Sequence, residues 1–122
     1  MRIVPAFVPG LCLSLAAGAC GERPVVPMVG ASTERGREAI QRYGCAACHA
    51  IPGIAGPHGH VGPPLDAMAR RAYIAGVVPN LPSEMIRWLM DPPQVDPLTA
   101  MPAMGVSEAE ARDMAAYLYA QD

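Results

Sequence analysis

Residues 45–49 of this 122-residue chain read Cys45-Ala46-Ala47-Cys48-His49. This C-x-x-C-H spacing is the attachment motif of c-type haem. On one helical turn, two thiols three residues apart can reach the two vinyl groups of one porphyrin, and the adjacent imidazole can point at the iron. The motif therefore predicts one covalently attached haem c, with thioether bonds at Cys45 and Cys48 and with His49 as an axial iron ligand.

Three other chemistries use a pair of cysteines at this spacing. Cys45 and Cys48 can form a disulfide in an oxidising compartment, a thioredoxin-like pair needs a surrounding βαβ pattern, and a zinc site can recruit His58 or His60. None of them explains a histidine directly after the second cysteine, so haem is the preferred interpretation. We then expect His58 and His60 to be solvated loop residues, with a secondary metal site or a pH-dependent ligand exchange as the alternative.

An iron atom held by histidine needs an explanation for its sixth coordination position. Residues 91–102 (DPPQVDPLTAMP) form a proline-rich segment in which Met101 follows Thr99. Pro102 removes a backbone donor and stiffens the chain beside the Met101 sulfur. Met101 is therefore the expected axial ligand, and Met104, three residues later, is the alternative.

The composition suggests a small domain that needs help to form a core. The chain has fourteen prolines and twelve glycines, but only one Trp, four Tyr and one Phe. So much Pro and Gly disfavours long helices or a regular sheet, and a short chain with few aromatic residues is marginal on its own. A bound haem would fill the centre, and without it we expect an apolar cavity between Cys48, Trp88 and Met101.

The charge balance excludes one class of partner. The net charge is −2, and all nine basic residues are arginine. A chain with this balance has no basic face for nucleic acid, so we expect no nucleic-acid partner.

Residues 1–19 are expected to be a signal peptide. They carry one early charge at Arg2, an apolar stretch over residues 11–17 and small residues at the end, which is the pattern of an export signal. A membrane-spanning helix needs about 20 apolar residues, whereas this stretch is short and contains prolines. An exported, periplasmic protein follows from this interpretation.

Cys20 stands where the signal would be cleaved, and two interpretations of it remain open. Residues 17–20 (AGAC) resemble a bacterial lipobox, in which the cysteine is acylated and anchors the protein to a membrane, and they also fit an A-x-A site for ordinary signal peptidase. The lone cysteine favours the lipid anchor. Residues 20–31 then form a flexible tether, and residues 32–122 form the folded domain.

Two helices are expected in that domain from the residues alone. Ser107 and Glu110 form a capping box that opens the last helix, and Ala111, Met114, Ala115 and Leu118 give it one apolar stripe. A first helix over residues 34–43 contains Gly36, which costs about 1 kcal/mol relative to Ala and so indicates a close approach of another backbone.

These motifs occur in the order that is typical of class I cytochromes c, and the chain resembles that family from about Ser32 to Tyr119. The resemblance implies an all-α class I cytochrome c fold, with about four short helices wrapped around one covalently attached haem. Residues 84–119 are also similar to cytochrome c domains associated with bacterial terminal oxidases.

The resemblance also implies a further helix over residues 84–91 and roles for individual residues. The carbonyl of Pro63 would accept the Nδ1–H of His49, and Arg71 would meet a haem propionate. Trp88 would line the haem pocket and Thr99 would lie on the propionate side. Tyr117 would lie where the last helix crosses the first.

A haem held by histidine and methionine has no open coordination position, so it suits one-electron transfer better than the binding of oxygen. We expect an electron carrier rather than an enzyme. The carrier would pass electrons to or within a respiratory oxidase chain. The expected partners are a terminal oxidase, a quinol–cytochrome c reductase or a similar redox protein. The alternative is a five-coordinate haem sensor or a peroxidase-like enzyme in which Met101 is labile.

Overall fold

The structure is a computed structural model that describes residues 28–121. The expected signal peptide, Cys20 and most of the expected tether lie outside the described residues. The last four tether residues form a turn in which the Ala31 N–H donates to the Met28 carbonyl at 3.0 Å. No helix within residues 28–121 is long and apolar enough to span a bilayer.

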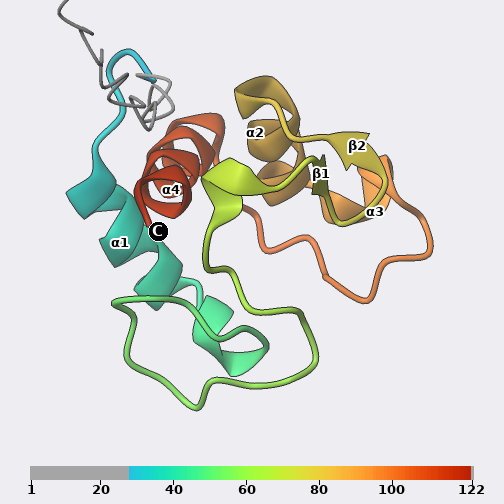
Figure 1. The fold of residues 1–122 in the computed structure, drawn as a ribbon, viewed down its shortest axis with the longest axis horizontal. Coiled ribbons are helices and arrows are strands. Elements are labelled where there is room, and N and C mark those ends of the chain that lie inside the picture. The colour runs from blue at the N-terminus through green and yellow to red at the C-terminus, as the bar shows by residue number, and fades with distance from the viewer. Residues whose placement is uncertain (1–27, 122) are drawn as a thin grey trace, which may run out of the picture.

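Helices dominate the described residues, which confirms the expected all-α class with about four short helices. The elements in chain order are α1 (Thr33–Arg42), the 3₁₀ turns η1 (Cys45–Ala47) and η2 (Met68–Arg70), strands β1 (Tyr73–Ile74) and β2 (Val78–Pro79), and helices α2 (Pro82–Met90), α3 (Pro92–Val95) and α4 (Glu108–Ala120). The strands form a two-residue antiparallel hairpin. Figure 1 shows α1 beside α4, and the irregular segment after η1 loops away from them at the bottom of the view.

Helices α1 and α4 begin at caps that the sequence encodes locally. The Ser32 side chain accepts from the N–H of Arg35 at the start of α1. At the start of α4, Ser107 and Glu110 form the predicted capping box, in which each side chain accepts from the other residue's N–H. The four residues of the predicted apolar stripe of α4 are all buried. The helix therefore presents its apolar face to the core as expected.

The close approach predicted at Gly36 is the crossing of α1 and α4. A Cβ atom at this position would overlap the carbonyl group of Asp113 and lie 3.0 Å from the N atom of Met114. These two helices also form the largest interface between elements in the structure. Glycine is therefore required at residue 36 because the backbones touch there.

The hydroxyl group of Tyr117 binds the turn that follows the C-x-x-C-H motif. The side chain is buried, and its hydroxyl donates to the carbonyl of Pro52 at 2.7 Å. Gly53 lies directly beneath this hydroxyl, because a Cβ there would be 2.6 Å from the oxygen. Tyr117 thus ties α4 to the turn that follows the C-x-x-C-H motif.

The middle of the chain differs from the sequence expectation in two places. Helix α2 begins at Pro82, two residues before the expected start, because proline is suited to the first helical position. Residues 92–95, expected to be part of a proline-rich loop, form the short helix α3. The Asp91 side chain caps α3 by accepting from the N–H of Gln94.

The core is built from aliphatic and methionine side chains. Met68, Met85 and Met114 are buried at 4%, 2% and 1% exposure, so they pack in the core. Met90 is the last residue of α2, and at 36% exposure its side chain is exposed to solvent.

Candidate functional site

One cavity of about 620 Å³ lies beside this core. Its volume is within the range of about 300–1,000 Å³ that is common for cofactor sites. All of the candidate site residues from the sequence line it, namely Cys45, Cys48, His49, Pro63, Arg71, Trp88, Thr99, Met101 and Met104. The fold therefore brings together residues that are up to 59 positions apart in the sequence.

The C-x-x-C-H motif reaches the cavity as a tight helical turn. Gly44 adopts a left-handed conformation with φ of 69°, and it turns the chain from the end of α1 into η1. The His49 N–H then donates to the Cys45 carbonyl at 3.1 Å. This turn directs Cys45 and Cys48 into the same cavity, as attachment to one porphyrin requires.

Cys45 does not have the character of a reactive redox thiol. Cys45 and Cys48 are free cysteines, not joined by a disulfide. Burial raises the pKa of the Cys45 thiol above its usual value, whereas reactive redox cysteines have a lowered pKa. No strand flanks the motif within residues 28–121 as a thioredoxin-like site would need.

His49 is held in one orientation by a single carbonyl. Its Nδ1 atom lies 2.7 Å from the carbonyl oxygen of Pro63. Because a carbonyl can only accept, Nδ1 must carry the proton, and the Nε2 lone pair is left available for a metal. Gly62 allows this geometry, since a Cβ there would overlap the imidazole ring.

The family comparison agrees with this geometry. The model of the cytochrome c family matches residues 33–121. The chain belongs to the cytochrome c family. A comparison with curated proteins finds no match.

Membership of the cytochrome c family confirms the expected fold and implies a covalent haem c and haem-based electron transfer. Members of the family are typically electron carriers rather than enzymes. The cavity of this cytochrome c fits such a group, because it offers two thiols, an imidazole with its Nε2 free and mostly apolar walls.

Met101 and Met104 both line the cavity of this cytochrome c. Met101 is half-buried and packs against the core, whereas Met104 is 46% exposed. The Thr99 hydroxyl accepts from the N–H of Met101 at 3.2 Å, which fixes the backbone at that residue. Trp88 is 8% exposed and forms part of the same wall.

Arg71 braces the chain next to the cavity. Its Nη2 atom donates to the carbonyls of Pro64 at 2.6 Å and Asp66 at 2.9 Å. These bonds close the loop before η2, and Arg71 also lines the cavity. Its expected contact with a haem propionate stays a prediction.

Sequence reasoning missed the pair that positions Arg71. The Asn80 amide donates to the carbonyls of Met68 and Arg71 at 2.7 and 2.8 Å, and it accepts from the Tyr119 hydroxyl at 2.7 Å. Burial raises the pKa of Tyr119 to about 12, so this hydroxyl remains a donor. No local pattern marks Asn80, because its partners come from η2 and from α4.

Sequence reasoning also missed that residues 59–62 form a cover over the backbone of the C-x-x-C-H motif. The Gly59 N–H donates to the Ala46 carbonyl at 3.2 Å, and the Gly62 N–H donates to the Cys48 carbonyl at 2.9 Å. A Cβ at Gly59 would overlap the Ala47 carbonyl. The glycines of this segment thus allow it to lie flat on the backbone of the C-x-x-C-H turn.

His58 and His60 lie on either side of Gly59 and are exposed, as expected of solvated loop residues. His58 has a positive φ of 49°. No group of three or more His, Cys, Asp or Glu side chains within residues 28–121 is placed to hold a metal ion.

Proposed function

We propose that this cytochrome c is a one-electron carrier with haem c attached at Cys45 and Cys48 and with His49 and Met101 as axial iron ligands. The observation that carries the proposal is the 2.7 Å hydrogen bond from His49 to Pro63, on the same cavity that Met101 lines. This bond leaves Nε2 of His49 as the only ring nitrogen that can bind iron.

When bound, haem c supplies a reversible one-electron couple. The chain's own residues set the properties of that couple. Methionine ligation raises the reduction potential relative to two histidines. Buried apolar side chains such as Met68, Met85 and Trp88 exclude water and disfavour the extra charge of the oxidised state. With His49 and Met101 both bound to it, the iron would suit electron transfer rather than oxygen binding.

The place of the protein in the cell is part of the same proposal. The signal-like residues 1–19 support export to the periplasm, where covalent haem attachment takes place, and Cys20 supports a lipid anchor on a membrane. The similarity of residues 84–119 to oxidase-associated domains supports electron transfer to or within a respiratory oxidase chain. This similarity favours a terminal oxidase as the partner, and a quinol–cytochrome c reductase or a similar redox protein is the other proposed partner.

The haem and its ligands are tested on protein produced in a periplasm that attaches haem c. We expect a haem that stays with the chain after denaturation, and a far-red sulfur-to-iron absorption band in the oxidised protein. Met101→Ala should abolish this band, and the control Met104→Ala should retain it. A band that survives in Met101→Ala and disappears in Met104→Ala would transfer the ligand role to Met104.

Carbon monoxide separates the carrier from the sensor or peroxidase-like alternative. A reduced carrier with both axial positions taken should show no rapid spectral change on addition of the gas. A rapid change would support the alternative in which Met101 is labile.

The anchor and the partner need separate experiments. Radioactive fatty acid should label the wild-type chain but not Cys20→Ala, and an unlabelled wild-type chain would exclude the lipoprotein. Purification from native membranes, followed by reduced-minus-oxidised spectra, should recover the cytochrome with an oxidase or a reductase.

A further inference from the structure

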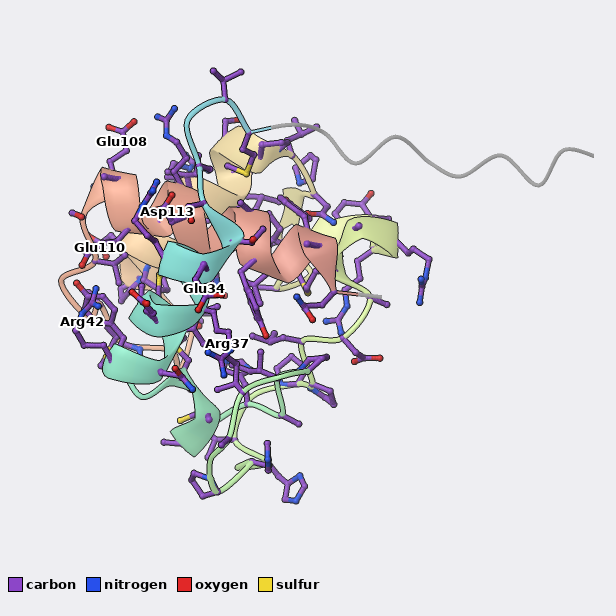
Figure 2. The ribbon with its side chains drawn as sticks, turned by 90° about the vertical axis from the view of Figure 1, so that its left-hand side faces the viewer. Glu34, Arg37, Arg42, Glu108, Glu110 and Asp113 are labelled. Atoms are coloured by element: carbon purple, nitrogen blue, oxygen red, sulfur yellow. The ribbon has the colours of Figure 1, made fainter. Side chains whose placement is uncertain are left out.

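Two carboxylates on α4 each bind one end of α1. Asp113 accepts from the Ser32 N–H at 2.7 Å and from Nε of Arg35 at 2.7 Å, at the first turn of α1. Glu110 accepts from Nη2 of Arg42 at 2.7 Å and from the Tyr43 hydroxyl at 2.9 Å, at the opposite end of α1. Figure 2 shows Glu110 and Arg42 on the same side of the molecule, with Asp113 further along α4.

Glu110 has a second set of contacts that Asp113 lacks. It accepts from the Ser107 N–H at 3.1 Å and from the Ser107 hydroxyl at 2.6 Å. The Tyr43 hydroxyl also lies 3.5 Å from the carbonyl oxygen of Gly105. Val106, which lies between Gly105 and Ser107 in the sequence, is buried at 7% exposure. Glu110 thus joins the end of α1 to the segment in which the Met101 loop returns to the core.

The two segments joined in this way are those next to the haem-binding residues. Tyr43 lies two residues before Cys45 and itself lines the cavity. Gly105 lies four residues after Met101. A displacement of either segment therefore changes the distance between the attachment motif and the Met101 loop.

We propose that Glu110 is a positioning residue that, through Tyr43 and Ser107, holds the Met101 loop against the haem-attachment motif and so keeps Met101 on the iron. This proposal rests on the proposed function, because it takes Met101 as the axial ligand. Asp113 binds the far end of the same helix, so it stabilises the fold without this role.

The bonds that Glu110 makes with Tyr43 and Ser107 should then determine how easily Met101 leaves the iron. A small ligand such as imidazole can bind the oxidised iron only when Met101 has left, so its apparent affinity follows the fraction of molecules in that state. A hydrogen bond to a charged group is stronger than one between neutral groups. Loss of the bonds from Glu110 should therefore raise the affinity for imidazole about tenfold, which corresponds to about 1.4 kcal/mol.

The experiment compares matched variants of the oxidised, haem-loaded protein. Glu110→Gln removes the charge and weakens the bonds that Glu110 accepts, whereas Tyr43→Phe removes the hydroxyl that binds Glu110 and Gly105. Both changes alter the size of the side chain little. Asp113→Asn weakens the other end of α1, and Glu108→Gln removes a charge from the first turn of α4, where Glu108 pairs with Arg112 at 2.7 Å. The measurements are the imidazole affinity, the melting temperature and the hydrogen exchange of residues 99–106.

We expect Glu110→Gln and Tyr43→Phe to bind imidazole about tenfold more tightly and to exchange faster at residues 99–106. Asp113→Asn should lower the melting temperature and leave both other measurements near wild type, and Glu108→Gln should change little. Equal imidazole affinity in Glu110→Gln and Asp113→Asn would overturn the proposal, as would wild-type affinity and exchange in Tyr43→Phe.

Failure of the proposed function gives a different result. A wild-type protein without the far-red sulfur-to-iron band would remove Met101 as the ligand. Hydrogen exchange of residues 99–106 in the same variants would still report whether Glu110 holds the loop. If Glu110→Gln does not fold, Tyr43→Phe carries the test, because it loses one hydroxyl and keeps the ring in the cavity wall.

Discussion

Gly62 lies so close to the imidazole ring of His49 that no side chain fits between them. The same residue donates its N–H to the Cys48 carbonyl at 2.9 Å, and the next residue, Pro63, accepts from Nδ1 of His49. One Gly-Pro pair therefore sets the distance, the orientation and the tautomer of the proximal imidazole.

Replacement of Gly62 by alanine should disturb His49 first. The new methyl group would displace the imidazole or the loop and weaken the bond to Pro63, so we expect a lower melting temperature and an altered absorption spectrum of the haem-loaded protein. Overpacking of this kind costs about 1–3 kcal/mol.

Gly30→Ala is the matched control for this change. Gly30 has a positive φ of 79° and nothing near its missing Cβ, so alanine there introduces backbone strain of about 1–2 kcal/mol without a steric clash. We expect its haem spectrum to match wild type. A normal spectrum in Gly62→Ala would show that His49 is oriented by something other than this contact.

Gly36→Val should weaken the crossing of α1 and α4. Valine would overlap the Asp113 carbonyl, and we expect a loss of about 3 kcal/mol in the free energy of unfolding, measured by denaturant titration of the haem-loaded protein. Gln41→Val on the exposed side of α1 controls for the helix propensity of valine, with an expected cost below about 1 kcal/mol. Equal losses in the two variants would contradict a close crossing at Gly36.

Asn80→Ala should loosen the chain that carries Arg71. It removes two donors to the carbonyls of Met68 and Arg71, and we expect a loss of about 2 kcal/mol in the free energy of unfolding. Tyr119→Phe removes only the hydroxyl that binds Asn80, so its loss should be about 1 kcal/mol. The prediction fails if Tyr119→Phe is the more damaging of the two in denaturant titration.

Acid should weaken the fold through Glu110. Hydrogen bonds from the Ser107 hydroxyl and N–H, with those from Tyr43 and Arg42, lower the pKa of Glu110 from 4.5 to about 2. Because the folded pKa is below the unfolded value, the stabilisation is complete above about pH 4.5 and is lost as the pH falls through about 2. Denaturant titrations between pH 6 and pH 2 should show this fall.

Glu110→Gln provides the comparison for the acid experiment. Glutamine does not titrate, so the stability of this variant should depend less on pH in that window than the stability of wild type. The remaining dependence includes Asp113, whose pKa is lowered chiefly by its hydrogen bond with Arg35. The same pH dependence in both proteins would argue against a charged Glu110 as a stabilising group.

Features that depend on neighbouring residues could be predicted from the sequence. The C-x-x-C-H turn, the capping box of Ser107 and Glu110 and the apolar stripe of α4 all lie within one or two helical turns. Gly36 was predictable for another reason, because a glycine inside a helix has a cost that only close packing explains.

Features that join distant segments could not be predicted in the same way. Glu110 was interpreted as a capping residue, and nothing near it in the sequence indicates Tyr43, 67 positions away. Asn80 and Tyr119 are 39 positions apart. The cover formed by Gly59 was visible only as an excess of glycine, since its partners are backbone carbonyls that any residue carries.

The crossing of α1 and α4 has a consequence for the order of folding. Arg35 and Asp113, which bind each other at this crossing, are 78 positions apart, so the two helices cannot pair until nearly the whole domain has been synthesised. A chain that ends before α4 lacks Met114 and Leu118, which line the cavity. The wall of the cavity beside Cys45 and Cys48 is therefore completed only when the last helix has packed against the first.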